Sequence, residues 1–128
     1  MTSGQHRFRG VHHVLLSVPA DKKAEAHQFY EEVLGFEPLA VAPEIGNGDD
    51  LWWYDCGDAQ VHVAIEPGFR PHQRAHPALL VENIDALGAQ LEAAGVEIRW
   101  NSHYPGLRRF YMRDPFGNRF EFAEPIRS

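Results

Sequence analysis

The hydrophobic pattern of this chain predicts the same order of structural elements twice. Residues 13–18 and 76–81 each open with a histidine and are typical of short, apolar strands. Each stretch is followed by apolar residues at helical spacing, over 21–34 in the first half and 83–94 in the second. Further β-rich stretches with a turn between them then complete each half. The chain is therefore predicted to contain an internal repeat.

The two predicted helices carry similar start and stop signals. Asp21 and Asn83 stand where an N-cap residue is expected, because a short polar side chain can accept a hydrogen bond from the first turn. Gly35 and Gly95 follow the last apolar positions and suit the left-handed conformation that ends many helices. Since these landmarks stay in register to within a few residues, we predict one βαβββ plan used twice.

This repeat predicts an α+β fold of two tandem βαβββ modules that form an open, cupped, mixed sheet with the helices outside. Module one spans about residues 10–67, module two spans about 75–124, and a segment at about 67–74 with prolines and a glycine links them. The chain has 128 residues, which is the size of one compact domain. We therefore expect a single domain over residues 1–128.

Alternation along the predicted strands separates an apolar face from a polar one. The apolar positions 14, 16 and 18, with their counterparts in the other strands, form a stripe that should pack against the helices. Four corresponding positions then point away from the helices, and they are occupied by His13, His62, His76 and Glu121. A sheet that curls toward this side would gather the four side chains in one concavity.

Three imidazoles and one carboxylate are a typical ligand set for a divalent transition metal, so we predict these four residues as metal ligands. The ion could be Zn, Ni, Mn, Co or Fe. Phe120 and Phe122 flank Glu121 and predict a buried environment for its carboxylate. A lone histidine is more often structural than a ligand, and this interpretation is kept for His6, His12, His27, His72 and His103.

Composition excludes several classes of partner. Eighteen acidic residues stand against 12 Lys and Arg, giving a net charge of −6, which argues against nucleic acid or an anionic membrane as main partner. The single Cys56 cannot form an internal disulfide and fits a reducing compartment. With no apolar run of membrane-spanning length and no signal-peptide pattern, we expect a cytoplasmic protein.

Two segments resemble the vicinal oxygen chelate superfamily, which includes glyoxalase I, bleomycin-resistance proteins, fosfomycin-modifying enzymes and extradiol dioxygenases. These segments are residues 29–36, FYEEVLGF, and residues 114–121, DPFGNRFE. The resemblance extends from Val11 to Glu124 and is closest to small glyoxalase-like members. Its motifs are specific for the superfamily and not for one reaction.

The resemblance implies two modules around a divalent metal, in a chain that forms a homodimer and often builds each site from both subunits. By position, His13 and His62 match the two ligands of module one, and His76 and Glu121 match those of module two. Glyoxalase I carries a glutamate where His62 stands. In this chain Glu121 would have to serve alone as the proton-transferring carboxylate.

The expected function is that of a metal-dependent glyoxalase-like enzyme, of lyase or isomerase type. It would chelate adjacent oxygens of a small substrate and stabilise an enediolate-like anion, with Glu121 as ligand and catalytic base. Two other reactions remain open, a fosfomycin-type thiol transfer using His13, His76 and Glu121 and an Fe-dependent extradiol-type dioxygenation. A further alternative is a non-catalytic, bleomycin-resistance-like drug-binding protein.

Substrate contacts are predicted from side-chain type alone. Arg109, Tyr111 and Trp53 are the candidate substrate-binding residues. Four arginines of module two could hold a carboxylate, phosphonate or phosphate, and these are Arg108, Arg109, Arg113 and Arg119. Core packing or a dimer interface is the alternative role for the tryptophans. Open sheet edges also predict a homodimer.

Overall fold

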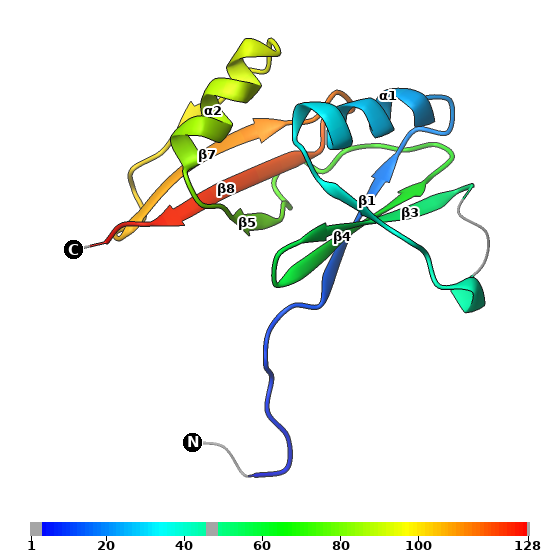
Figure 1. The fold of residues 1–128 in the computed structure, drawn as a ribbon, viewed down its shortest axis with the longest axis horizontal. Coiled ribbons are helices and arrows are strands. Elements are labelled where there is room, and N and C mark those ends of the chain that lie inside the picture. Colours follow the sequence, from blue (N-terminus) through cyan, green and yellow to red (C-terminus); the bar gives the residue numbers. More distant parts are fainter. Residues whose placement is uncertain (1–3, 46–48, 128) are drawn as a thin grey trace.

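The computed structural model describes residues 4–45 and 49–127, and it contains two βαβββ modules placed side by side (Figure 1). Module one consists of β1 (His13–Val18), α1 (Lys23–Gln28), a π-helical turn η1 (Phe29–Val33), β2 (Glu37–Leu39), a 3₁₀ turn η2 (Pro43–Ile45), β3 (Leu51–Cys56) and β4 (Ala59–Ile65). Module two consists of β5 (Ala78–Leu80), α2 (Ile84–Ala93), β6 (Arg99–Trp100), β7 (Leu107–Arg113) and β8 (Arg119–Pro125).

The strands form two mixed sheets of four strands each. Their orders are β1-β4-β3-β2 and β5-β8-β7-β6, so each module repeats the topology of the other. The first strand of each module pairs in parallel with the last, and the remaining pairs are antiparallel. The predicted α+β fold of two tandem modules is confirmed, with the sheet present as two four-stranded halves.

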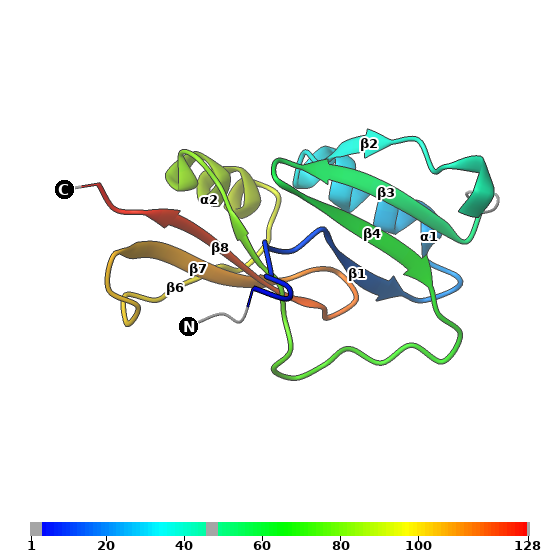
Figure 2. The same cartoon turned by 90° about the horizontal axis from the view of Figure 1, so that it is seen from below.

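Both helices cover the same side of the molecule, which leaves the other side of the two sheets open (Figures 1 and 2). In β1 the helix-facing Leu16 and Val18 are buried, whereas Leu15, just before Leu16, is 61% exposed. The predicted alternation is therefore confirmed in this strand. The helix-facing side chains of both modules join one core, which includes Tyr30, Tyr54, Val61, Val63, Ile84, Leu91, Phe110 and Phe120.

The helix starts differ from the predicted caps. Asp21 does not cap, because α1 begins after Lys22 and that start has no side-chain cap. Asn83 does occupy the N-cap position of α2, but its side chain makes no capping hydrogen bond. The carboxylate of Glu124 on β8 instead accepts hydrogen bonds from the backbone N–H groups of Asn83 and Ile84, at 3.0 and 2.9 Å. A partner from a distant strand thus satisfies donors that a local residue was predicted to satisfy.

The helix ends follow the sequence more closely. Gly35 and Gly95 have φ angles of 81° and 84°, as predicted for left-handed residues that end a helix. The first helix continues as the π-helical turn η1, in which Phe29 and Tyr30 are buried. Neither helix in the described ranges 4–45 and 49–127 is long and apolar enough to cross a membrane.

A buried polar network joins the two modules. The Tyr30 hydroxyl of η1 donates a hydrogen bond to Asp114, at the end of β7. Asp114 also accepts from the backbone N–H groups of Phe116 and Asn118, and the Asn118 amide donates to the backbone oxygen of Ser17 on β1. Burial raises the pKa of the Asp114 carboxyl, although these hydrogen bonds favour its charged form. The network therefore fixes the 114–118 turn against module one.

Candidate metal and ligand site

The four predicted metal ligands meet in two pairs, one in each module. His13 and His62 have stacked rings with centroids 4.0 Å apart, on β1 and β4. In module two, His76 Nε2 lies 3.0 Å from Glu121 Oε1. Within the described residues, no group of three or more His, Cys, Asp or Glu side chains could hold a metal ion. The four predicted ligands therefore lie as two separate pairs within one chain.

The fold positions the module-two pair through a parallel register. Ala78 of β5 lies opposite Glu121 of β8, so the segment just before β5 runs beside the start of β8. The sequence predicted a strand that opens at His76, but β5 begins at Ala78, so His76 lies two residues before the strand. Phe120 and Phe122 point into the core, and strand alternation places Glu121 between them on the open side.

Both nitrogens of the His76 ring face oxygen atoms. Nδ1 lies 2.6 Å from the backbone oxygen of Arg74, which can only accept a hydrogen bond. With Nδ1–H donating to Arg74, the ring donates to Glu121 only when Nε2 also carries a proton, and without that proton the lone pair of Nε2 is available to an ion. A fixed imidazole of this kind, with its other nitrogen bonded to a backbone carbonyl, is the usual environment of a metal-binding histidine.

Arg109 holds the second oxygen of the Glu121 carboxylate. Its Nη1 donates to Glu121 Oε2 at 3.1 Å, and its Nη2 donates to the Asn101 side chain at 3.0 Å. Burial alone would raise the pKa of the Glu121 carboxyl, but the hydrogen bonds from His76 and Arg109 lower it below its usual range. Glu121 is 6% exposed, so this carboxylate is a buried anion with one oxygen directed to His76.

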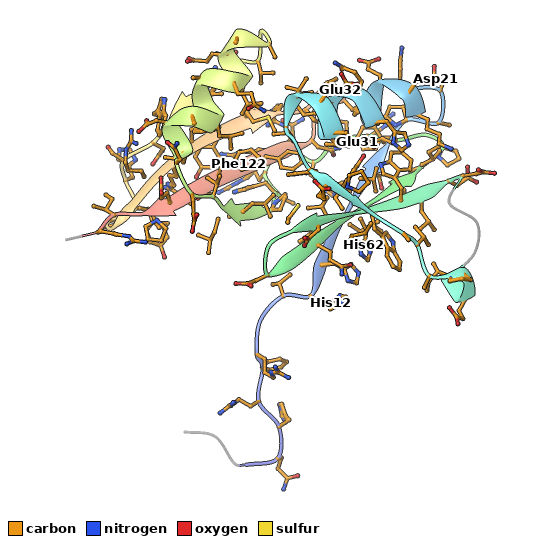
Figure 3. The ribbon with its side chains drawn as sticks, viewed as in Figure 1. His12, Asp21, Glu31, Glu32, His62 and Phe122 are labelled. Atoms are coloured by element: carbon orange, nitrogen blue, oxygen red, sulfur yellow. The ribbon has the colours of Figure 1, made fainter. Side chains whose placement is uncertain are left out.

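The module-one pair belongs to a stack of rings. His62 lies between His13 and Trp53, with a centroid distance of 4.5 Å to Trp53. His62 Nε2 lies 2.8 Å from the Gln60 side-chain oxygen and can donate to it, which leaves Nδ1 as the free ring nitrogen. His12 Nδ1 lies 2.9 Å from His13 Nδ1. Figure 3 shows His12 and His62 on the side of module one away from α1.

We expect the His62 environment to make the metal-free protein less stable in acid. Burial, followed by the nearby charges of His13 and His12, lowers the pKa of His62 below its ordinary value. The unfolded chain therefore binds the proton more readily, and stability is lost as the pH falls through about 6.5. Urea unfolding at pH 8 and pH 5.5, with EDTA present, should show a smaller acid loss for His62→Gln than for wild type. His103→Gln is the control, and equal losses in all three proteins would contradict the prediction.

The donor chemistry of the two pairs fits a divalent transition metal. Each pair offers an imidazole nitrogen whose ring is fixed by a second contact, and the module-two pair adds a carboxylate oxygen. Because Arg109 binds the other oxygen of Glu121, that carboxylate has one oxygen left for an ion. The prediction that His13, His62, His76 and Glu121 form one metal site stays a prediction, since it needs both pairs.

The three predicted substrate contacts lie beside the ligand pairs. Trp53 covers one face of His62, opposite the face that His13 covers. The Tyr111 ring meets His76 edge-on, with centroids 5.5 Å apart. Arg109 lies 5.4 Å from the Tyr111 ring centre and binds Glu121. Core packing, the alternative role predicted for the tryptophans, applies to Trp52, which is buried.

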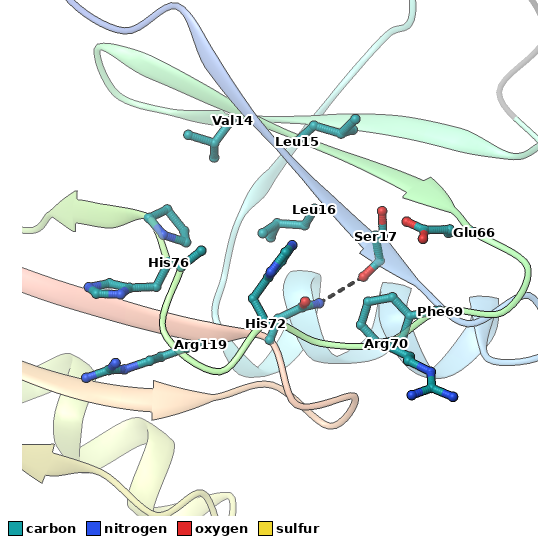
Figure 4. A pocket seen from close by; sticks show the side chains of 13 residues that line it. Val14, Leu15, Leu16, Ser17, Glu66, Phe69, Arg70, His72, His76 and Arg119 are labelled. Atoms are coloured by element: carbon teal, nitrogen blue, oxygen red, sulfur yellow. Dashed lines mark hydrogen bonds between the residues drawn. The ribbon is translucent and has the colours of Figure 1, made fainter.

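A cavity of about 340 Å³ adjoins His76 (Figure 4). It lies between β1, the segment that links the modules, and the start of β8, and its polar lining includes Ser17, Glu66, Arg70, His72, His76 and Arg119. Its apolar wall is formed by Val14, Leu15, Leu16, Phe69, Ala75 and Pro77. Sequence reasoning missed this cavity, because no spacing signal brings the linker against β1.

The structural role predicted for His27 fits its contacts. Its ring stacks on Trp52 at 4.2 Å, and its Nδ1 lies 2.7 Å from Glu31, beneath α1. His12, which was also expected to be structural, contacts His13 of the module-one pair. Burial raises the pKa of the Cys56 thiol to about 11, so this cysteine is not an activated nucleophile.

Comparisons with known proteins agree with this fold. The model of the Glyoxalase/Bleomycin resistance protein/Dioxygenase superfamily matches residues 10–122. A putative glyoxalase family protein from Bacillus anthracis is 35% identical, with a TM-score of 0.87 over 95% of this chain and 99% of its own. TnmS3, an antibiotic binding protein from Streptomyces sp. CB03234, is 26% identical, with a TM-score of 0.69 over 95% and 100%.

Lactoylglutathione lyase from Agrobacterium tumefaciens resembles this chain in fold alone, at 21% identity. Its TM-score is 0.67, and the match covers 90% of this chain and 92% of that protein. A comparison with curated proteins finds no significant match.

Proposed function

Because the chain belongs to the Glyoxalase/Bleomycin resistance protein/Dioxygenase superfamily, we propose that it is a metal-dependent, glyoxalase-like enzyme acting on a small molecule. We propose further that each metal site joins His13 and His62 of one copy to His76 and Glu121 of a second copy. The observation that carries this proposal is the partly buried His76–Glu121 pair, in which Arg74 fixes His76 Nδ1 and Arg109 fixes Glu121 Oε2.

The proposed homodimer explains two features of the open side. Two ligand pairs lie in separate modules, and a second copy would supply the missing pair to each. The edge strands β1 and β5 also carry exposed apolar side chains, with Leu15 at 61% and Leu80 at 74% exposure. Covering such edges and side chains is a general reason for a small open-sheet protein to associate.

The proposed chemistry uses Glu121 as both ligand and proton carrier. A divalent ion, when bound, would supply Lewis-acid polarisation of adjacent substrate oxygens. Arg109 keeps the Glu121 carboxylate ionised and oriented through Oε2, while Oε1 remains on the open side. With Oε2 held by Arg109, Oε1 could act as a base only when its own bond to the ion is released. It would then take a proton from a substrate carbon and return it to a neighbouring one, which is the proton movement of an isomerase-type reaction.

A second candidate is a protein that binds a drug-like ligand without chemistry. Two contacts favour this alternative. Gln60 already hydrogen-bonds to His62 Nε2, so this nitrogen needs no metal as partner, and the aromatic Trp53 beside His62 is a side chain of the type that packs against apolar ligands. The 26% identical structural neighbour named as an antibiotic binding protein is consistent with this alternative. Such a protein would keep its ligand affinity after treatment with EDTA, whereas the proposed enzyme would lose it.

Metal stoichiometry and solution state together test the proposal. We expect a dimer by light scattering at micromolar concentration and about one equivalent of Ni²⁺ or Zn²⁺ per chain after refilling, because each dimer would hold two sites. Isomerase or lyase activity on small α-oxo substrates should depend on that metal. Less than about a tenth of an equivalent would contradict the proposed metal site.

A further inference from the structure

The four arginines of module two, grouped together by sequence, have separate roles in the structure. Arg108 Nη1 donates to Asp85 at 2.6 Å and its guanidinium lies over Trp100. Arg109 is bound to Glu121 and Asn101, as described above. Arg113 donates to backbone oxygens of the linker and of the following turn, its shortest contact being 2.7 Å to Gly117. These three arginines are engaged in structural contacts.

Arg119 differs from the other three. Within residues 4–45 and 49–127, its guanidinium has no hydrogen-bond acceptor and no acidic partner, and its described contact is the face of Tyr111 at 4.4 Å. The side chain is half-buried, so its charge is only partly hydrated. A guanidinium held against an aromatic ring, with its five donors free, is well suited to bind an oxyanion.

Arg119 lines the 340 Å³ cavity together with a second arginine and two histidines. Arg70 and His72 project from the linker onto the same cavity, and Glu66 is the one acidic residue among the lining residues that the structure describes. Figure 4 shows Arg119 and His76 at one end of the cavity and Glu66 with Ser17 at the other. Arg119 is therefore the arginine at the His76 end (Figure 4), while the wall formed by residues such as Leu16 and Phe69 is apolar.

The position of Arg119 relates the cavity to the module-two ligand pair. Arg119 precedes Glu121 by two residues on β8, so both side chains lie on the same face of the strand, roughly 7 Å apart along it. Tyr111 contacts both Arg119 and His76 and separates them by one ring. If one end of a small molecule bound beside His76 and Glu121, a group a few bonds further along that molecule would lie within reach of Arg119.

We propose that this cavity is the substrate's anion subsite, and that the substrate is a small molecule with a carboxylate or phosphonate beside an apolar group. Arg119 binds the oxyanion, and the wall around Leu16 and Phe69 receives the apolar part. This inference rests on the proposed function, because it assigns a substrate class to the same site.

The test uses anionic probes on the purified full-length chain, with metal removed so that no ion can bind the oxyanion. Phenylphosphonate and benzoate carry an anion on an apolar ring, and benzamide is the uncharged counterpart. We expect NMR titration to show both anions binding to wild type, with resonances near the cavity shifted, and benzamide binding at least about tenfold more weakly. Arg119→Met should weaken anion binding by at least about tenfold, and Arg119→Lys should weaken it less.

Arg108→Met is the matched control, since it removes a guanidinium of the same module that is held by Asp85. It should leave anion binding unchanged. The inference is overturned if neither anion binds, if benzamide binds as well as benzoate, or if Arg119→Met binds both anions like wild type. Parallel Ni²⁺ titration separates the two proposals, because lost Ni²⁺ binding with intact anion binding contradicts only the metal site.

Discussion

Replacing Glu121 by alanine should weaken Ni²⁺ binding by at least about 100-fold, the largest functional effect expected of a single substitution in this chain. Changes to groups that merely support a metal ligand typically cost 10–100-fold in affinity, so removal of the ligand itself should exceed that range. The buried carboxylate supplies the anionic donor of the proposed site, and its Oε1 atom lies 3.0 Å from His76 Nε2. Isothermal titration with Ni²⁺ measures the effect directly.

Glu66→Gln provides the matched control for Glu121→Ala. Glu66 is an exposed carboxylate that lines the adjoining cavity but contacts neither member of the ligand pair. Its replacement should leave Ni²⁺ affinity within about threefold of wild type, since exposed charges at a distance are screened by salt. If Glu121→Ala bound Ni²⁺ as tightly as wild type, the carboxylate would not be a ligand.

The largest loss of stability is expected for Asp114→Ala. Asp114 is 5% exposed and accepts hydrogen bonds from the Tyr30 hydroxyl, from two backbone N–H groups and from the Asn118 amide. Removing the acceptor leaves several buried donors unsatisfied and breaks the link between the modules. We expect a decrease of about 3–5 kcal/mol in the free energy of unfolding, measured by urea denaturation.

Two further variants make the Asp114 result specific. Tyr30→Phe removes one donor and leaves the remaining bonds to Asp114 in place, so its loss should be clearly smaller than that of Asp114→Ala. Asp58→Ala removes an exposed carboxylate from the β3–β4 turn and should change stability negligibly. Equal stability of Asp114→Ala and wild type would show that the network does not hold the modules together.

Patterns that act over short distances were read correctly from the sequence. The repeat of strand and helix, the left-handed glycines at 35 and 95, and the alternation in β1 all depend on neighbouring residues, and the structure confirms them. The structure adds that the first and last strands of each module are adjacent, which brings His13 beside His62 and His76 beside Glu121.

Features that depend on residues far apart in the chain could not be predicted from the sequence. The cap of α2 comes from Glu124. Its carboxylate accepts a hydrogen bond from the N–H of Ile84, which lies 40 residues earlier in the chain. The separate roles of Arg108 and Arg119 depend on whether an acidic residue from another element lies nearby. Strand alternation likewise assigned the four ligands to one face, but it could not specify that they would lie in two separate pairs.

Metal binding by mixed dimers tests the shared site most directly. One variant carries His13→Ala and His62→Ala, and the other carries His76→Ala and Glu121→Ala, so neither should bind Ni²⁺ alone. After subunit exchange in an equal mixture, half of the dimers are mixed and each contains one intact site. The account predicts recovery of about one quarter of the wild-type Ni²⁺ per chain. No recovery, with exchange verified by mass spectrometry, would contradict a site built from two copies.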